Sequence, residues 1–178
     1  SKDETFKIIN SFKCDKIKIY KINNEGIIAK SRNLGIMNST GNWIAFLDSD
    51  DSWEKNKLEI CLKYIEKKNI DFIYHDLNIN YQNKKKIFSE TMKGYYLKKP
   101  IIKDLLKKGN STPTSSIVVK KELIIKVGLL DESKNIAMSE DYNLTLKIAS
   151  TTYRFKYIKK KLGTYLIHLY ILLTLAML

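Results

Sequence analysis

Apolar runs and helically spaced apolar residues alternate through the middle of the chain. Apolar side chains recur at every third or fourth position in Gly26 to Met37 and again in Lys55 to Lys67, which predicts two helices. The continuous apolar run WIAFL, Trp43 to Leu47, predicts a strand buried on both faces, and IDFIYH, Ile70 to His75, predicts another strand. This alternation indicates an α/β domain with a mostly parallel sheet, whose ligands bind at the carboxyl ends of the strands.

The pattern is less regular on either side of this central part. Helical spacing predicts a helix over Thr5 to Phe12, and KIKIY, Lys16 to Tyr20, alternates polar and apolar residues as a half-buried strand does. In the second half SSIVV, Ser115 to Val119, is strand-like. Lys121 to Val127 and Asp141 to Ser150 are helix-like.

The size and composition indicate one globular domain. The chain has 178 residues, 44% of them hydrophobic, which is enough for one ordinary core, and its two prolines and seven glycines form no linker. Cys14 and Cys61 lie far apart and have no close-spaced partner, so neither a disulfide framework nor a zinc knuckle is indicated. A reducing, cytosolic setting fits this cysteine usage best.

The formal net charge of +13 raises the question of a polyanionic partner such as nucleic acid or an anionic membrane. Only Arg32 and Arg154 are arginines among the 32 basic residues, whereas base readout and bidentate phosphate contacts favour arginine. We therefore interpret the lysine runs as solvated faces and expect no nucleic-acid partner. The charge can still steer anionic ligands toward the protein.

Three carboxylates follow the apolar strand directly in WIAFLDSDDSW: Asp48, Asp50 and Asp51. Carboxylates at the end of a strand can hold Mg²⁺ or Mn²⁺, which take few protein oxygens and accept others from phosphates. The alternative is that these residues cap the next helix. A calcium-binding EF-hand loop is excluded, because Trp53 stands where that loop needs glycine and a strand-like run precedes the acids.

A second acidic pair, Glu140 and Asp141, follows Ser139 at the start of the last predicted helix. Ser139 can cap this helix, and acids in a first turn commonly serve only to complement the helix dipole. His75 ends an apolar strand, and we interpret it as a packed or surface histidine rather than a metal ligand.

These segments together resemble family 2 glycosyltransferases. SRNLGIMNSTGNWIAFLDSDDSWEKNKLE is similar to the central block of that family, with its (S/A)RNxG helix, small-residue turn around Gly41, buried strand, Asp-x-Asp pair and following Trp. TPTSSIVVKKELIIKVGLLDES and SEDYNLTLKIA resemble the acceptor-side strand and the Glu-Asp segment, in the expected order. The resemblance covers about Ser1 to Gly163.

The resemblance implies a Rossmann-like GT-A fold, inversion at the anomeric carbon and a divalent cation, Mn²⁺ or Mg²⁺, on the diphosphate of a nucleotide-sugar donor such as a UDP-sugar. Asp50 would ligate the metal together with Asp48, which would also lie toward the ribose or donor sugar. Asp51 would be a supporting acid, and Arg32 would hold the nucleotide end of the donor.

The catalytic base implied by the resemblance is Asp141, with Glu140 as its supporting neighbour. An inverting transfer needs such a carboxylate, separate from the metal site, to take the proton of the acceptor hydroxyl. The family often carries a Tyr-Arg-x-His segment near the position where this chain has Tyr165-Leu166-Ile167-His168. Because the arginine is absent, no metal or phosphate role is carried over to His168.

Both ends of the chain depart from the family pattern. SKDETFKII resembles the segment that follows the family's first strand-helix-strand unit, so we expect residues 1–161 to be a partial catalytic domain that lacks this unit. Residues 162–178 are almost wholly apolar and slightly short for a membrane span. Three interpretations of this tail stay open: a membrane-associated segment, a buried element, or an out-of-frame ending.

The sequence thus predicts a hexosyl- or N-acetylhexosaminyltransferase domain that acts on a glycan or lipid-linked acceptor in bacterial surface-polysaccharide assembly. We expect it in the cytoplasm, with peripheral association at the inner face of the membrane. An inactive remnant of such an enzyme is one alternative. The other is a basic module that binds nucleic acid or a membrane surface, independently of Asp50 and of metal.

Overall fold

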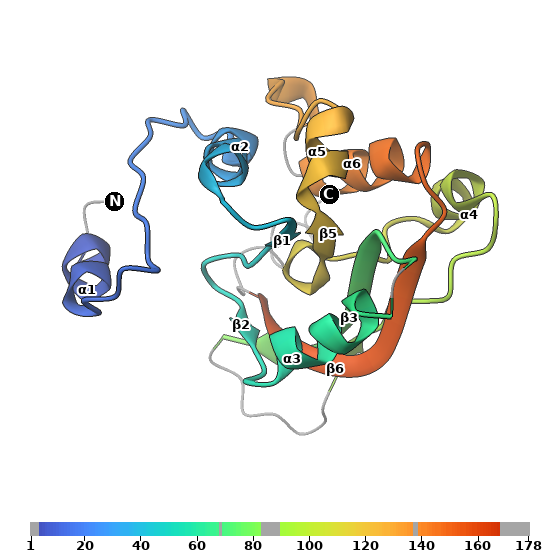
Figure 1. Ribbon diagram of the computed structural model, residues 1–178, viewed down its shortest axis with the longest axis horizontal. Helices are drawn as coiled ribbons and strands as arrows, with labels where there is room; N and C mark the ends of the chain where they lie inside the picture. Colours follow the sequence, from blue (N-terminus) through green and yellow to red (C-terminus); the bar gives the residue numbers. More distant parts are fainter. Residues whose placement is uncertain (1–3, 68, 83–89, 137–138, 168–178) are drawn as a thin grey trace.

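The computed structural model describes residues 4–67, 69–82, 90–136 and 139–167. A six-stranded sheet lies at its centre, with helices on both faces, and the segment that contains the first helix extends away from this body (Figure 1). The strands are β1 (Trp43–Ala45), β2 (Ser52–Trp53), β3 (Phe72–Tyr81), β4 (Thr91–Met92), β5 (Val118–Lys120) and β6 (Phe155–Ile167). The α-helices are α1 (Thr5–Ser11), α2 (Ile28–Asn38), α3 (Lys57–Ile65), α4 (Ile101–Lys108), α5 (Lys121–Lys126) and α6 (Glu140–Ala149). Two short 3-10 helices are η1 (Thr114–Ser116) and η2 (Lys134–Ile136).

The sheet is mixed, so the prediction of a mostly parallel sheet is wrong, although the α/β class is confirmed. The strand order is β1-β5-β3-β6-β2, with β4 paired to β3, and only β3 and β6 pair in parallel. β5 is antiparallel to both of its neighbours, so β1, β3 and β6 run in one direction, as helical crossovers between strands require. The sequence pattern could not show that β5 enters between β1 and β3.

Two apolar layers bury the faces of this sheet. On one face, α2, α5 and α6 cover Phe72 and Tyr74 of β3 and Val119 of β5. On the other face, α3 packs through Cys61 against Ile73 and its neighbours on β5 and β6. Successive residues of a strand point to opposite faces, so the continuous apolar run of β3 fills both layers. The framework that carries the site is therefore a sheet with a core on each side.

Most predicted elements are present, with two local differences. β1 ends at Ala45 and is only half-buried, because it is the first strand of the sheet order and has a paired neighbour on one side only in the described part of the chain. The strand-like segment Ser115 to Val119 is split into the end of η1 and the beginning of β5.

The strand predicted for Lys16 to Tyr20 is wrong. This segment forms no strand, and its apolar side chains are exposed, with Ile17 at 44% and Ile19 at 39%. A strand is stable only when a neighbour accepts its backbone hydrogen bonds, and within the described residues no strand lies beside it. The alternation of polar and apolar side chains is therefore not sufficient evidence for a strand.

The last strand runs into the apolar tail that the sequence suggested. β6 extends through Leu162, which is buried, to Ile167, while 168–178, including His168, lie outside the described residues. Gly163 allows β6 to approach β2 closely, because a Cβ atom there would lie 2.6 Å from the Ser52 carbonyl oxygen. Within the described ranges no helix is both long and apolar enough to span a membrane.

Candidate active site

The acidic turn, which we define as residues 48–51, connects β1 to β2 beside one end of the sheet. α3 begins only at Lys57, after Asn56 in the capping position, so the acids do not cap this helix and the alternative interpretation is wrong. The turn is closed by a hydrogen bond from the Asp51 amide to the Asp48 carbonyl at 3.1 Å. It is tied to β6 by the Leu166 amide, which donates to Asp51 Oδ1 at 3.0 Å.

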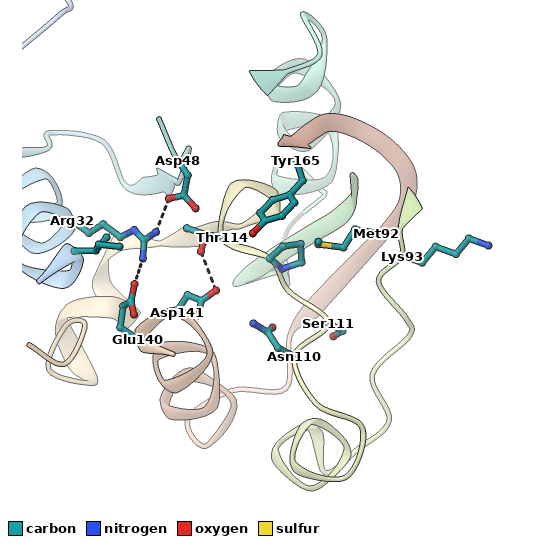
Figure 2. A pocket seen from close by; sticks show the side chains of 12 residues that line it. Arg32, Asp48, Met92, Lys93, Asn110, Ser111, Thr114, Glu140, Asp141 and Tyr165 are labelled. Carbon is teal, nitrogen blue, oxygen red and sulfur yellow. Dashed lines mark hydrogen bonds and ion pairs between the residues drawn. The ribbon is translucent and has the colours of Figure 1, made fainter. Parts of the chain in front are cut away.

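Arg32 of α2 joins the two acidic groups that the sequence singled out. Its Nη2 lies 2.5 Å from Asp48 Oδ1, and its Nη1 lies 2.7 Å from Glu140 Oε1 (Figure 2). The side chains of Arg32 and Glu140 are 14% and 8% exposed, so this bridge is shielded from water. One guanidinium group thereby fixes the position of the acidic turn relative to the first turn of α6.

Asp141 lies next to Glu140 but has different partners. Thr114 Oγ1 donates a hydrogen bond of 3.0 Å to its Oδ2, and the Tyr142 amide donates one of 2.6 Å to its Oδ1. Burial raises the pKa of the Asp141 carboxyl above its usual value. Ser139 occupies the N-cap position of α6, and both acids lie in its first turn, as predicted, but the Ser139 side chain makes no capping hydrogen bond.

A pocket of about 360 Å³ opens between these groups. Figure 2 shows Arg32, Asp48, Glu140 and Asp141 along one side of it and Tyr165 of β6 on the other. Burial, followed by the charges of Asp51, Asp50, Asp48 and Asp141, raises the pKa of the Tyr165 hydroxyl above its usual value.

Several lining residues were not predicted from the sequence. Besides Tyr165 they are Met92, Asn110 and Ser111, which lie outside the predicted motifs, and Thr114, which lies in the acceptor-side segment but was not singled out there. None of these side chains stands out in the sequence, so only their proximity in the fold identifies them as lining residues. His75, in contrast, is fully buried and lies outside the lining, which agrees with its interpretation as a packed residue.

The acidic turn fits a divalent cation that takes most of its ligands from a substrate. In the described part of the chain no three His, Cys, Asp or Glu side chains are grouped to enclose a metal. Asp51 is half-buried, burial raises the pKa of its carboxyl, and its Oδ2 has no hydrogen-bond partner among the described residues. The turn carries three carboxylates, and one of them has an oxygen without a hydrogen-bond partner among the described residues. Such a turn suits Mg²⁺ or Mn²⁺, because these ions typically bind one or two protein carboxylates together with phosphate oxygens.

Comparison with known proteins identifies the family. The model of "Glycosyl transferase family 2" matches residues 1–128. The chain belongs to glycosyl transferase family 2. A glycosyltransferase of Rickettsia felis is 34% identical over 152 residues, which are 84% of this chain and 24% of that protein. The Escherichia coli enzyme WfgD, a UDP-Glc:alpha-D-GlcNAc-diphosphoundecaprenol beta-1,3-glucosyltransferase, is 39% identical over 80 residues, which are 44% of this chain and 31% of WfgD.

The solved structures confirm the GT-A fold of this family 2 chain. Staphylococcus aureus TarS in complex with UDP-GlcNAc superposes with a TM-score of 0.70 at 18% identity, over 94% of this chain and 47% of TarS. The match spans less than half of TarS, and the same holds for the matches to the Rickettsia and Escherichia proteins. The acidic turn lies inside the region matched by the family model, whereas Glu140 and Asp141 lie beyond it.

Replacing Arg32 by Met should lower the free energy of unfolding of this family 2 domain by about 3 kcal/mol. This is the low end of the usual cost of breaking a buried ion pair, because the Asp48 side chain keeps some exposure. The cause is that Glu140 would stay buried without its cation. Urea unfolding at pH 7 measures the effect. Lys30→Met is the matched control, since its partner Glu25 is 59% exposed and such pairs contribute at most about 1 kcal/mol. Equal stability of the two variants would contradict the bridging role of Arg32.

Proposed function

We propose that this domain transfers a hexosyl or N-acetylhexosaminyl group from a nucleotide-sugar donor to a glycan or lipid-linked acceptor, with inversion at the anomeric carbon. The observation that carries the proposal is the pocket, which has Asp48 of the acidic turn on one side and an independent half-buried carboxylate, Asp141, within the same lining. A transferase of this kind needs both a site for the leaving diphosphate and a separate base.

The donor diphosphate fits beside the acidic turn only if positive charge accompanies it. Arg32 is occupied by Asp48 and Glu140, and Lys93 is the other cationic residue of the lining. A bound Mn²⁺ or Mg²⁺ would neutralise the departing diphosphate, and Asp50 and Asp48 are the residues that would hold it. TarS, which shares the fold, was solved with UDP and with UDP-GlcNAc, and this supports a UDP-sugar as donor.

The roles of the remaining residues follow from this placement. The Asp48 amide donates a hydrogen bond to Ser115, and one of its carboxylate oxygens accepts a hydrogen bond from Arg32. Because Asp48 is held in this way, it can orient the ribose or donor sugar with little reorganisation. Arg32 fixes the acidic turn through its ion pair with Asp48, and it would also hold the nucleotide end of the donor, as the resemblance implies. Asp141 accepts the proton of the acceptor hydroxyl, and Thr114 orients its carboxylate.

The acceptor approaches from the side of Asn110 and Ser111, opposite the acidic turn in the lining (Figure 2). The relatives WfgD and WfaP are named for a GlcNAc-diphosphoundecaprenol acceptor, and AmsB of Erwinia amylovora is named for amylovoran biosynthesis. These names support a lipid-linked acceptor and a place in bacterial surface-polysaccharide assembly.

A lipid-linked acceptor would bring the domain to the inner face of the cell membrane. Residues 93–108 contain six lysines and one aspartate, and on α4 Lys103 and Lys107 are exposed beside Leu106, which is 63% exposed. Basic residues near an anionic leaflet contribute about 1 kcal/mol each. α4 leads directly into Asn110 and Ser111, so peripheral binding through this helix would present the pocket to the acceptor. Both cysteines are free, in keeping with a cytoplasmic setting.

The test is UDP release from a panel of UDP-sugars, with a polyprenyl-diphosphate-linked GlcNAc acceptor presented in lipid vesicles. We expect at least one donor to yield UDP with Mn²⁺ and none to do so with EDTA, and we expect faster release with anionic than with neutral vesicles. No UDP from any donor would favour the inactive remnant. Release that is equal with EDTA would contradict the metal, and release that is equal on neutral vesicles would contradict the membrane contact through α4.

A further inference from the structure

Lys57, at the first position of α3, is buried in a way that is unusual for lysine. Its side chain is fully buried, and it forms no ion pair with any described carboxylate. Lysine is almost never buried to this degree without a partner charge, because its ammonium group loses its hydration. A residue retained at such a cost to stability calls for an explanation in its contacts.

Two contacts hold the Lys57 ammonium under the acidic turn. Its Nζ donates a hydrogen bond of 2.8 Å to the carbonyl oxygen of Ser115, and it stands 3.7 Å from the centroid of the Trp53 ring. Trp53 Nε1 donates to the same carbonyl at 2.9 Å. The Ser115 carbonyl therefore receives two donors, one from α3 and one from β2, which lie side by side in Figure 1.

Ser115 carries this restraint to the acidic turn. It is 1% exposed, and its Oγ accepts a hydrogen bond of 3.0 Å from the Asp48 amide. The Asp48 carbonyl in turn accepts the amide of Asp51, which closes the turn. The contacts thus run from Lys57 through one serine to the backbone of the turn whose carboxylates are the proposed metal ligands.

We propose that Lys57 is a positioning residue for the metal-binding turn, acting through Ser115 and Trp53 rather than by touching substrate. This inference rests on the proposed function of the acidic turn. Groups one contact removed from a metal site orient its ligands, and their loss typically costs about 10- to 100-fold in metal affinity or activity. The sequence suggests nothing of this role, because Lys57 appears there as one more lysine in a lysine-rich helix.

The ionisation of Lys57 gives the arrangement a pH dependence. Burial lowers the pKa of the ammonium to about 7, against a small opposing effect of the neighbouring Cys61. The other titratable neighbour, His75, has its pKa lowered to about 4 by burial and is neutral here. As pH rises through 7, Lys57 loses its cation-π contact and its charge-assisted hydrogen bond, so the turn is held less firmly.

Fold stability should change in the opposite direction. The unfolded chain keeps Lys57 protonated up to about pH 10.4. Between pH 7 and that value the unfolded state therefore binds more protons than the folded state, and stability contributed by this group rises with pH. A purely structural lysine would not be expected to weaken the site while leaving the fold as stable or more so.

The experiment compares Lys57→Met, which keeps the length of the side chain and removes its charge, with Lys63→Met on the exposed face of the same helix. UDP titration with Mn²⁺ at pH 6.5 should show about 10- to 100-fold weaker binding for Lys57→Met, with unchanged binding for the control. Thermal unfolding at the same pH should give Lys57→Met a Tm at least equal to that of the unaltered chain. Unchanged UDP affinity, or a lower Tm accompanying the loss, would overturn the proposal.

A second measurement does not depend on donor binding. In a Trp43→Phe background Trp53 is the only tryptophan, and its fluorescence should titrate with a midpoint near pH 7 as the neighbouring ammonium loses its proton. Adding Lys57→Met should abolish this step. A failure of UDP to bind the unaltered chain would reject the proposed function while leaving this step in place. Absence of the step in the chain with Lys57 would reject the placement of Lys57 itself.

Discussion

Asp141→Asn is expected to lower turnover by about 10²- to 10⁴-fold, the usual contribution of general-base catalysis, while UDP affinity stays nearly unchanged. The base acts on the acceptor proton in the transition state and contributes little to ground-state binding of the donor. Burial raises the pKa of Asp141, which strengthens it as a base, so turnover should also fall as pH drops through this raised value. Initial rates of UDP release between pH 4 and 8, beside UDP titration, measure both effects.

The Asp141→Asn substitution is not expected to destabilise the fold. Because the folded environment raises the pKa of Asp141, it disfavours the charged form, and a neutral Asn should leave stability at pH 7 equal or higher. Glu140→Gln should reduce turnover less, since Glu140 is engaged by Arg32 and not by Thr114. Near-normal turnover of Asp141→Asn together with loss in Glu140→Gln would reverse the two roles. Full activity of both would leave the first turn of α6 a structural element.

Asp50→Ala is expected to remove Mn²⁺-dependent UDP binding, a loss of at least about 100-fold that exceeds the usual effect of residues one shell further out. Without this carboxylate, the diphosphate would face Asp48 and Asp51 with no cation between them. Isothermal titration of UDP at fixed Mn²⁺ measures the change. Asp104→Ala is the matched control, because Asp104 lies on α4 and pairs with Lys108. Equal affinity of the two variants would show that Asp50 is not a metal ligand.

The parts of the site that were predicted from sequence are those carried by contiguous motifs. Asp48, Asp50 and Asp51 follow an apolar run directly, and a strand that ends in a polar turn brings such residues to one edge of a sheet whatever surrounds it. The same local logic placed Glu140 and Asp141 in a first helical turn. Contacts between these motifs, such as the bridge made by Arg32, depend on tertiary packing and became visible only in the structure.

Helix faces were predicted less well than helix positions. The helical spacing in Lys55 to Lys67 puts Leu58, Cys61, Leu62 and Ile65 on one apolar face. Of these, Cys61 is buried, but Leu58 and Leu62 are 47% and 52% exposed, whereas the polar Lys57 is fully buried. Lys57 faces the interior, where its Nζ donates a hydrogen bond to the Ser115 carbonyl oxygen. Periodicity reports hydrophobicity along one chain and contains no information about such long-range partners.

The central claim is that the acidic turn binds the diphosphate of a nucleotide-sugar through a divalent cation. The most direct test is calorimetric titration of the unaltered chain with UDP, first in the presence of Mn²⁺ and then with EDTA. The account predicts saturable binding with Mn²⁺ and none with EDTA. It also predicts that raising the salt concentration weakens this binding only modestly, because the contacts are specific and partly shielded from water. Binding that is indifferent to Mn²⁺ and lost with salt would contradict the claim and would instead describe a basic surface that attracts anions.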